Sequence, residues 1–247
     1  MSSKDLLNAA IKGNITDCQI LMHKKVRFTS RVFIAAVRNG HLELVKWLIS
    51  VNCPLSKSAG NVAVFNGRKE VFLWLWEHHR KTTMHWNKAK LCNSAANGNQ
   101  LELLKLLRST ELSDGPIEWD FTASEYAANN GYVEILQWIY DNGGSISDYC
   151  DNTARLNNKL NVLQWLESIG KEVDRAWACK SAAACGDLEM LKWAAYDSNG
   201  ECYLSTEFVN LAIHFHHDEI VDWLGERGIN SFNRIITNHR LQVTQEA

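Results

Sequence analysis

Four side chains near the C-terminal end of the chain have the types and spacing of a metal site: His214, His216, His217 and Asp218. A helix would place His214 and His217, three residues apart, on one face, and imidazole is a good zinc ligand. His216 and His217, however, fall on positions of a repeated turn that His41 also occupies. A structural role is therefore the preferred interpretation, and no metal is predicted.

Motifs of catalysis are missing from the sequence. There is no GxGxxG, P-loop, HExxH, paired CxxC or GxSxG segment. An Asp-His-Ser or Cys-His constellation could be assembled only by choosing residues freely from distant parts of the chain. We therefore predict that the protein is not an enzyme, has no catalytic residues and uses no cofactor or small-molecule substrate.

A cluster of basic residues could instead bind the phosphate groups of a ligand. His78-His79-Arg80-Lys81 is followed by His85, Lys88 and Lys90, and residues 1–124 hold 17 Lys and Arg against 10 Asp and Glu. A nucleic-acid or phosphate-binding protein that uses this basic N-terminal half is the alternative function. The whole chain nevertheless has a net charge of -2 and a pI of about 6.5, and nucleic-acid-binding domains are usually strongly basic. A solvated loop is the preferred interpretation of the cluster.

Eight copies of one unit account for almost the whole sequence. Each copy carries an alanine, and four residues later a residue that tolerates a left-handed backbone in seven of the eight copies. The alanines are Ala9, Ala36, Ala63, Ala95, Ala127, Ala154, Ala182 and Ala212, and the turn residues are Gly13, Gly40, Gly67, Asn99, Gly131, Asn158, Gly186 and His216. Self-similarity at this period predicts a repeat array in which each unit buries its apolar face against its neighbours.

The half of each unit after the turn has the pattern of an amphipathic helix. In the second copy Leu42, Val45, Trp47 and Leu48 have the spacing of one helical face. Six of the ten tryptophans share one position of the unit, Trp47, Trp74, Trp138, Trp165, Trp193 and Trp223. We interpret this tryptophan column as core packing rather than as a stacking platform for a ligand.

The segment AAVRNGHLELVKWLISVNCP, which contains Gly40, His41, Leu42 and Glu43, resembles an ankyrin repeat. Its Lys-Trp-Leu and Asn-Cys-Pro variants are similar to the divergent repeats of large DNA viruses of protists. The Thr-Pro-Leu-His segment of the family is absent from every copy. The resemblance implies a protein-protein interaction scaffold that binds a partner protein through a concave face, and a viral protein that works inside a host cell.

Most units are shorter than the usual ankyrin repeat, and the missing residues fall where that family projects a hairpin. The predicted fold class is therefore all-α, an ankyrin-like α-solenoid of about eight helix-turn-helix repeats with truncated hairpin fingers. Residues 1–230 are predicted to form a single array, and residues 231–247 a C-terminal capping helix with a frayed tail.

Composition is that of a soluble protein inside the cell. Hydrophobic residues make up 46% of the chain, charged residues 22%, and no apolar run is long enough to be a signal peptide or to cross a membrane. The seven cysteines are scattered, and buried reduced thiols are expected rather than disulfides. We expect a monomer without membrane contact, in the cytoplasm, or in the host cytoplasm or nucleus if the protein is viral.

The position two residues before the turn varies from copy to copy and matches the exposed end of the first helix in ankyrin-like proteins. Mixed occupancy on a repeated frame is what a surface shaped for one partner would show. Trp86 and Trp119 lie off the tryptophan column and could supply aromatic anchors. The predicted protein-binding residues are Arg38, Phe65, Trp86, Asn97, Trp119, Asn129, Leu156 and His214.

Overall fold

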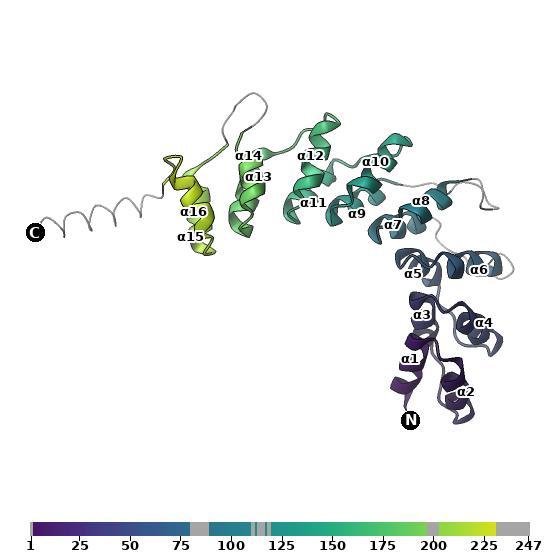
Figure 1. Cartoon of the computed structure of the whole chain (residues 1–247). Coiled ribbons are helices and arrows are strands. Elements are labelled where there is room, and N and C mark those ends of the chain that lie inside the picture. The colour runs from purple at the N-terminus through teal and green to yellow at the C-terminus, as the bar shows by residue number, and fades with distance from the viewer. Residues whose placement is uncertain are drawn as a thin grey trace, which may run out of the picture. The chain divides into compact units, whose positions relative to one another are not determined.

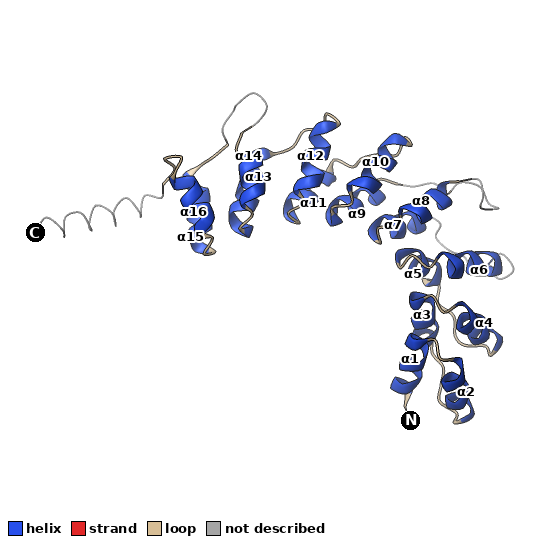
Figure 2. Ribbon diagram, in the orientation of Figure 1, coloured by secondary structure: helices blue, strands red, loops and turns tan. Residues whose placement is uncertain are grey.

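The computed structural model describes residues 2–79, 89–109, 112, 117, 120–196 and 203–230. Sixteen α-helices and no β-strand occur in these residues, and Figure 2 shows them connected by loops. In chain order they are α1 (Ser3–Lys12), α2 (Ile15–His23), α3 (Ser30–Asn39), α4 (Leu42–Ser50), α5 (Ala59–Phe65), α6 (Lys69–His79), α7 (Ala89–Asn97), α8 (Leu101–Arg108), α9 (Thr122–Asn130), α10 (Val133–Asp141), α11 (Tyr149–Leu156), α12 (Leu160–Ser168), α13 (Arg175–Cys185), α14 (Leu188–Ala194), α15 (Thr206–His214) and α16 (Asp218–Gly225). The predicted all-α class of helix-turn-helix repeats is confirmed.

The helices form successive pairs, visible in Figure 1, in which a short turn joins a first helix with an odd number to a second helix with an even number. The members of a pair contact each other, as in α1 and α2 or α13 and α14. First helices also pack on the next first helix, from α1 through α3 and α5 to α7, and from α11 through α13 to α15. Each pair thus buries its apolar side against its neighbours.

Two compact units make up the chain. One comprises Met1–Ala127 and Glu134–Ser147, and the other comprises Ala128–Val133 and Asp148–Ala247. The repeat period of the sequence runs through both units, and the single array over residues 1–230 stays a prediction. The predicted capping helix and tail at 231–247 lie outside the described residues.

The turn inside every pair uses a left-handed backbone. All eight turn residues have positive φ, from +54° at Asn158 to +83° at Gly131. Asn99, Asn158 and His216 adopt this conformation without being glycine. An L residue pays roughly 1–2 kcal/mol for a left-handed conformation, and asparagine reduces that cost by bonding locally. The prediction of a turn at this position is confirmed in all eight repeats.

The alanines that recur in every repeat lie in the first helices. All eight are buried, with exposed fractions of 0% except for 5% at Ala9. The second helices contribute a column of larger apolar residues that is at most 4% exposed. Its members are Cys18, Val45, Phe72, Leu104, Leu136, Leu163, Leu191 and Val221. Small residues on one helix and large ones on its neighbour let the helices interdigitate at interior packing density.

The tryptophan column is less buried than predicted. Trp165 and Trp223 are 6% and 9% exposed, whereas the other four tryptophans of the column are half-buried. Two rings of the column are covered by a cation: the guanidinium of Arg175 lies 4.4 Å from the half-buried Trp193 ring, and that of Arg227 lies 3.8 Å from the buried Trp223 ring. Such contacts satisfy an indole face without a fully apolar surrounding.

Gly98 lies where two repeats approach each other closely. A Cβ atom added there would overlap the backbone carbonyl oxygen of Phe65, which ends α5. Because the obstructing atom belongs to the backbone, it cannot rotate away. We expect Gly98→Ala to lower the free energy of unfolding by about 2–3 kcal/mol, the cost of overpacking a close contact. Chemical denaturation followed by circular dichroism measures this loss.

Gly143→Ala is the matched control for Gly98→Ala, because Gly143 has a φ of +72° but no atom within 4 Å of an added Cβ. Its free energy of unfolding should fall by only about 1 kcal/mol, the cost of placing an L residue in a left-handed conformation. Equal losses for the two variants would contradict the proposed backbone contact at Gly98.

Connections between the repeats are short. The described loops at 24–29, 51–58, 142–148 and 169–174 contain no strand, which agrees with truncated fingers. Most of the two longer connections, 80–88 and 109–121, lies outside the described residues. Among the helices that the structure describes, none has the length and apolar character needed to cross a membrane.

Six cysteines lie in the described residues, and none of them forms a disulfide with another described cysteine. Five are buried, as predicted, and Cys185 is exposed. Burial raises the pKa of the Cys18 thiol to about 11, and the nearby carboxylate of Asp17 adds to this shift. Burial likewise raises the pKa of the Cys53 thiol to about 11. Both thiols therefore stay protonated and act as small apolar core groups.

Candidate functional site

The variable position lies at the C-terminal end of the first helices and faces outward. Arg38, Phe65, Leu156 and His214 are exposed. Asn97 and Asn129 are half-buried. The other two predicted binding residues, Trp86 and Trp119, lie outside the described residues.

These residues belong to two separate groups. Arg38, Phe65 and Asn97 end successive first helices of one compact unit, whereas Asn129, Leu156 and His214 belong to the other unit. Phe65 and Leu156 expose 44% and 56% of their surface, although both are large apolar side chains.

Side chains from the following repeat fix the backbone at the end of the first helices. His41 Nε2 lies 2.8 Å from the carbonyl oxygen of Ile11, and Arg68 Nε donates to that of Arg38 over 2.9 Å. The same arrangement places His217 Nε2 3.0 Å from Ala184 O. These three turn-to-carbonyl contacts satisfy helix-end carbonyls that would otherwise need water. They hold the backbone on which the variable side chains stand. In a different contact, Asn161 Nδ2 on α12 donates to the carbonyl oxygen of the turn residue Gly131 over 2.9 Å.

The contacts also explain the histidines at the C-terminal end. A carbonyl can only accept, so His217 Nε2 carries the proton in its contact with Ala184. His216 is the left-handed turn residue, and the His214 ring meets the Phe215 ring edge-on at 4.8 Å. No group of three or more His, Cys, Asp or Glu side chains placed to hold a metal occurs in the part of the chain that the structure describes. Sequence reasoning missed the contact, although the polar residue that follows the turn in several repeats is a signal for it.

A polar groove of about 420 Å³ lies between the first helices α5, α7 and α9 in the Met1–Ala127 part of the chain. Amide, hydroxyl and two oppositely charged groups line it: Asn61, Lys90, Asn93, Ser94, Asn97, Asp120, Thr122 and Tyr126. Asn97 is one of the predicted binding residues. Tyr126, which lines the groove, exposes 40% of its surface. The groove therefore combines hydrogen-bonding groups, one charge of each sign and an aromatic side chain.

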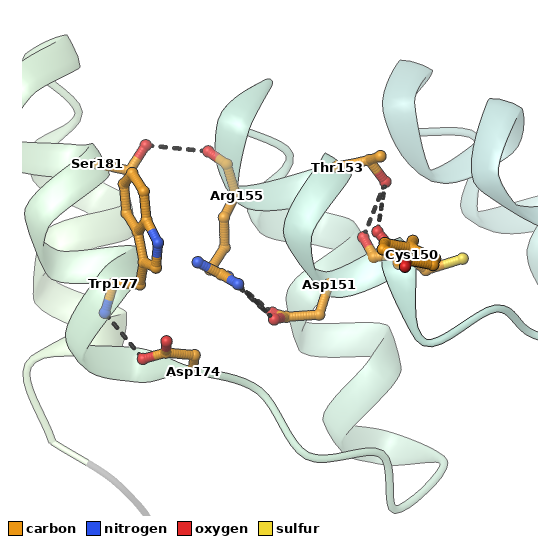
Figure 3. A network of polar contacts seen from close by, with 8 residues as sticks. Cys150, Asp151, Thr153, Arg155, Asp174, Trp177 and Ser181 are labelled. Atoms are coloured by element: carbon orange, nitrogen blue, oxygen red, sulfur yellow. Dashed lines mark hydrogen bonds and ion pairs between the residues drawn. The ribbon is translucent and has the colours of Figure 1, made fainter.

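The second compact unit carries a buried ion pair, drawn in Figure 3. The Arg155 guanidinium holds both carboxylate oxygens of Asp151, with Nε 3.0 Å and 3.1 Å from them and Nη2 2.8 Å from Oδ2. Ser181 Oγ donates to the Arg155 carbonyl over 3.0 Å, and the guanidinium lies 5.4 Å from the Trp177 ring. Arg155 is only 6% exposed, so it binds α11 to α13 and is not open to a ligand.

This ion pair replaces residues that are apolar or small in the other repeats. Where Arg155 stands, the neighbouring repeats have the buried residues Ala128 and Ala183. Where Asp151 stands, they have Ser124 and Cys179, which are also buried. A salt bridge inside a repeat core was not predicted from the sequence, although a charged pair four residues apart at two core positions is a readable signal.

Comparison with known proteins gives a distant structural likeness and no assignment of family. No family model and no curated protein matches the chain. Among solved structures, the ankyrin repeat domain of human ASB11 is similar, at 14% sequence identity and a TM-score of 0.37, over 84% of this chain and 90% of that chain. The assignment to stacked helical pairs rests on the helices and turns described above.

Proposed function

We propose that the chain is a non-enzymatic protein-protein interaction module of ankyrin type, which binds a partner protein through the outward face of its first helices. The observation that carries this proposal is the division between constant and variable positions. The alanine column is buried in every repeat, while the position two residues before the turn holds residues as different as Arg38, Phe65 and His214. Packing fixes the first set and leaves the second free to match a partner.

The chemistry of this face supports a protein as the partner. Phe65 and Leu156 are exposed apolar groups, and Tyr126 is an exposed aromatic one. Aromatic residues are enriched among the side chains that dominate the binding energy of protein interfaces. The turn-to-carbonyl contacts hold the supporting backbone in place before binding, and this lowers the entropy cost of association.

The resemblance of the repeats to ankyrin repeats of large DNA viruses of protists extends the proposal. In this view the chain acts on a protein of a host cell, in the cytoplasm or nucleus, through the concave face of a repeat array. The binding residues proposed for that face are Arg38, Phe65, Trp86, Asn97, Trp119, Asn129, Leu156 and His214.

Affinity capture with quantitative mass spectrometry tests the proposal. The full chain is used as bait in an extract of the cells that produce it, beside Phe65→Ser and a control variant, Glu43→Gln, whose exposed carboxylate lies on the second helix α4. We expect a partner that the wild type and Glu43→Gln capture equally and that Phe65→Ser captures at least about tenfold less. A partner captured equally by all three variants would contradict binding through the first-helix face.

The alternative, a nucleic-acid-binding protein, makes a different prediction for the same samples. Much of the basic cluster lies outside the described residues, and His78 stacks on Trp74 with ring centroids 5.0 Å apart. Retention of the chain on heparin resin in 0.5 M salt would support the alternative, because a protein held by many phosphate-like contacts keeps measurable affinity there. Elution at low salt is the result expected for the interaction module.

A further inference from the structure

We infer that the polar groove between α5, α7 and α9 binds an extended polypeptide segment by its main chain. The amides of Asn61 and Asn93 would exchange hydrogen bonds with the backbone of that segment. This inference rests on the proposed interaction function and names the form of the partner.

An unpaired acceptor inside the groove points to a ligand with N–H groups. The side-chain oxygen of Asn93 is buried, and no described residue donates a hydrogen bond to it. A buried acceptor without a partner costs about 1–3 kcal/mol, so such groups in proteins call for a reason. A ligand that donates an N–H to this oxygen removes the cost.

Asparagines at the ends of the first helices in neighbouring repeats form hydrogen bonds within the fold. Asn39 and Asn66 donate to the carbonyl oxygens of Ala35 and Val62, each over 2.8 Å, and so stabilise the ends of their helices. Asn93 lies in the middle of α7 instead, on the side that lines the groove. Its amide therefore has a position suited to recognition rather than to capping.

Two equivalent amides match the periodicity of an extended chain. Asn61 and Asn93 each lie two residues before the alanine of their repeat, on the packed helices α5 and α7. Packed helices lie about 8–10 Å apart. In the polyproline II conformation a chain repeats every three residues, or about 9 Å, and leaves its N–H and C=O groups unpaired. A side-chain amide offers both a donor and an acceptor, which is the complement of a peptide group.

The charge of the groove favours a peptide over a phosphate-bearing ligand. Among the lining side chains that the structure describes, Lys90 is the one basic residue, and Asp120 places a carboxylate in the same groove. An anionic ligand would meet that carboxylate and the acceptor oxygen of Asn93, both of which repel it. A neutral main chain meets neither penalty, and Tyr126 adds an aromatic surface for one of its side chains.

Selection from a displayed library of random twelve-residue peptides tests the inference on the full chain. A selected peptide is then titrated against the wild type, Asn93→Leu, and the control Glu102→Gln, whose exposed carboxylate lies on the second helix α8. We expect Asn93→Leu to weaken binding at least about tenfold and Glu102→Gln to leave it unchanged. Leucine is close to asparagine in size and removes an unpaired polar group, so the denaturation midpoint of Asn93→Leu should not fall.

Backbone recognition has its own readout. Replacing one backbone N–H of the selected peptide at a time with N-methyl should abolish binding at one or two positions and change little at the others. Uniform tolerance of N-methylation, unchanged binding to Asn93→Leu, or failure of the library to yield a peptide would overturn the inference. So would tight binding of an oligo(dT) single strand that Asn93→Leu weakens.

Failure of this inference can be distinguished from failure of the proposed function. If Phe65→Ser releases a captured protein partner but Asn93→Leu does not, the interaction module stands and capture of a main chain in the groove is wrong.

Discussion

Asp151→Asn is expected to lower the free energy of unfolding by about 3 kcal/mol, because it leaves the buried guanidinium of Arg155 without its counter-charge. The arginine side chain is 7% exposed and that of its partner 17%, so little water can replace the lost carboxylate. The Nη1 atom of Arg155 is also buried, and no described residue accepts a hydrogen bond from it. Because water reaches the Asp151 side chain, the expected loss of free energy lies near the lower end of the range for broken buried ion pairs. Urea denaturation followed by circular dichroism measures it.

The double variant Asp151→Ser with Arg155→Met is the control for this prediction. Ser124 is buried at the position of Asp151 in the preceding repeat, so serine suits that position. Methionine keeps most of the volume of arginine over Trp177. Replacing both charges removes the desolvation cost together with the attraction, and the double variant should recover to within about 1 kcal/mol of the wild type. A double variant less stable than Asp151→Asn would show that the ion pair itself stabilises the repeat.

Trp165→Ala should cost still more, about 4 kcal/mol. Its indole is 6% exposed, and removal of a buried tryptophan costs about 3–5 kcal/mol through lost burial and the cavity left behind. Trp193 occupies the same column in the same compact unit but is half-buried. We therefore expect Trp193→Ala to cost only about 2 kcal/mol, including its contact with Arg175.

Denaturation of the two tryptophan variants, followed by circular dichroism, compares these losses. Hydrogen exchange of the α12 and α14 backbone amides then shows whether each loss is local, as expected when repeats contact only their neighbours. Equal losses for Trp165→Ala and Trp193→Ala would contradict the difference in burial.

The helices and turns could be predicted from the sequence because they depend on residues close together in the chain. A left-handed turn needs a suitable residue at one position, and even Asn99 and His216 satisfy it. Burial of the alanines could also be predicted, because a short turn brings the two helices of a pair close together and favours small residues between them. The repetition of the unit eight times amplified these local signals.

Features that depend on contacts between repeats were predicted less well. The tryptophan column was expected in the core, but the Trp193 ring is only half-buried, and the arginine at the start of α13 covers it. The Asp151–Arg155 pair and the groove around Asn93 depend on side chains that meet only after α5, α7 and α9, or α11 and α13, have packed. Periodicity tells which face of a helix is buried, but not which polar groups then become neighbours.

The turn-to-carbonyl contacts have a consequence for how the chain forms during synthesis. In each of the three, the side chain belongs to a later repeat and the carbonyl to the one before it, as in His41 with Ile11 and Arg68 with Arg38. A chain leaving the ribosome from its N-terminal end can therefore lock each helix end as soon as the next turn emerges. Each of these contacts can form once the later repeat has been synthesised, without any residue further along the chain. The protein can therefore fold one repeat at a time, each new repeat packing on a repeat that has already folded.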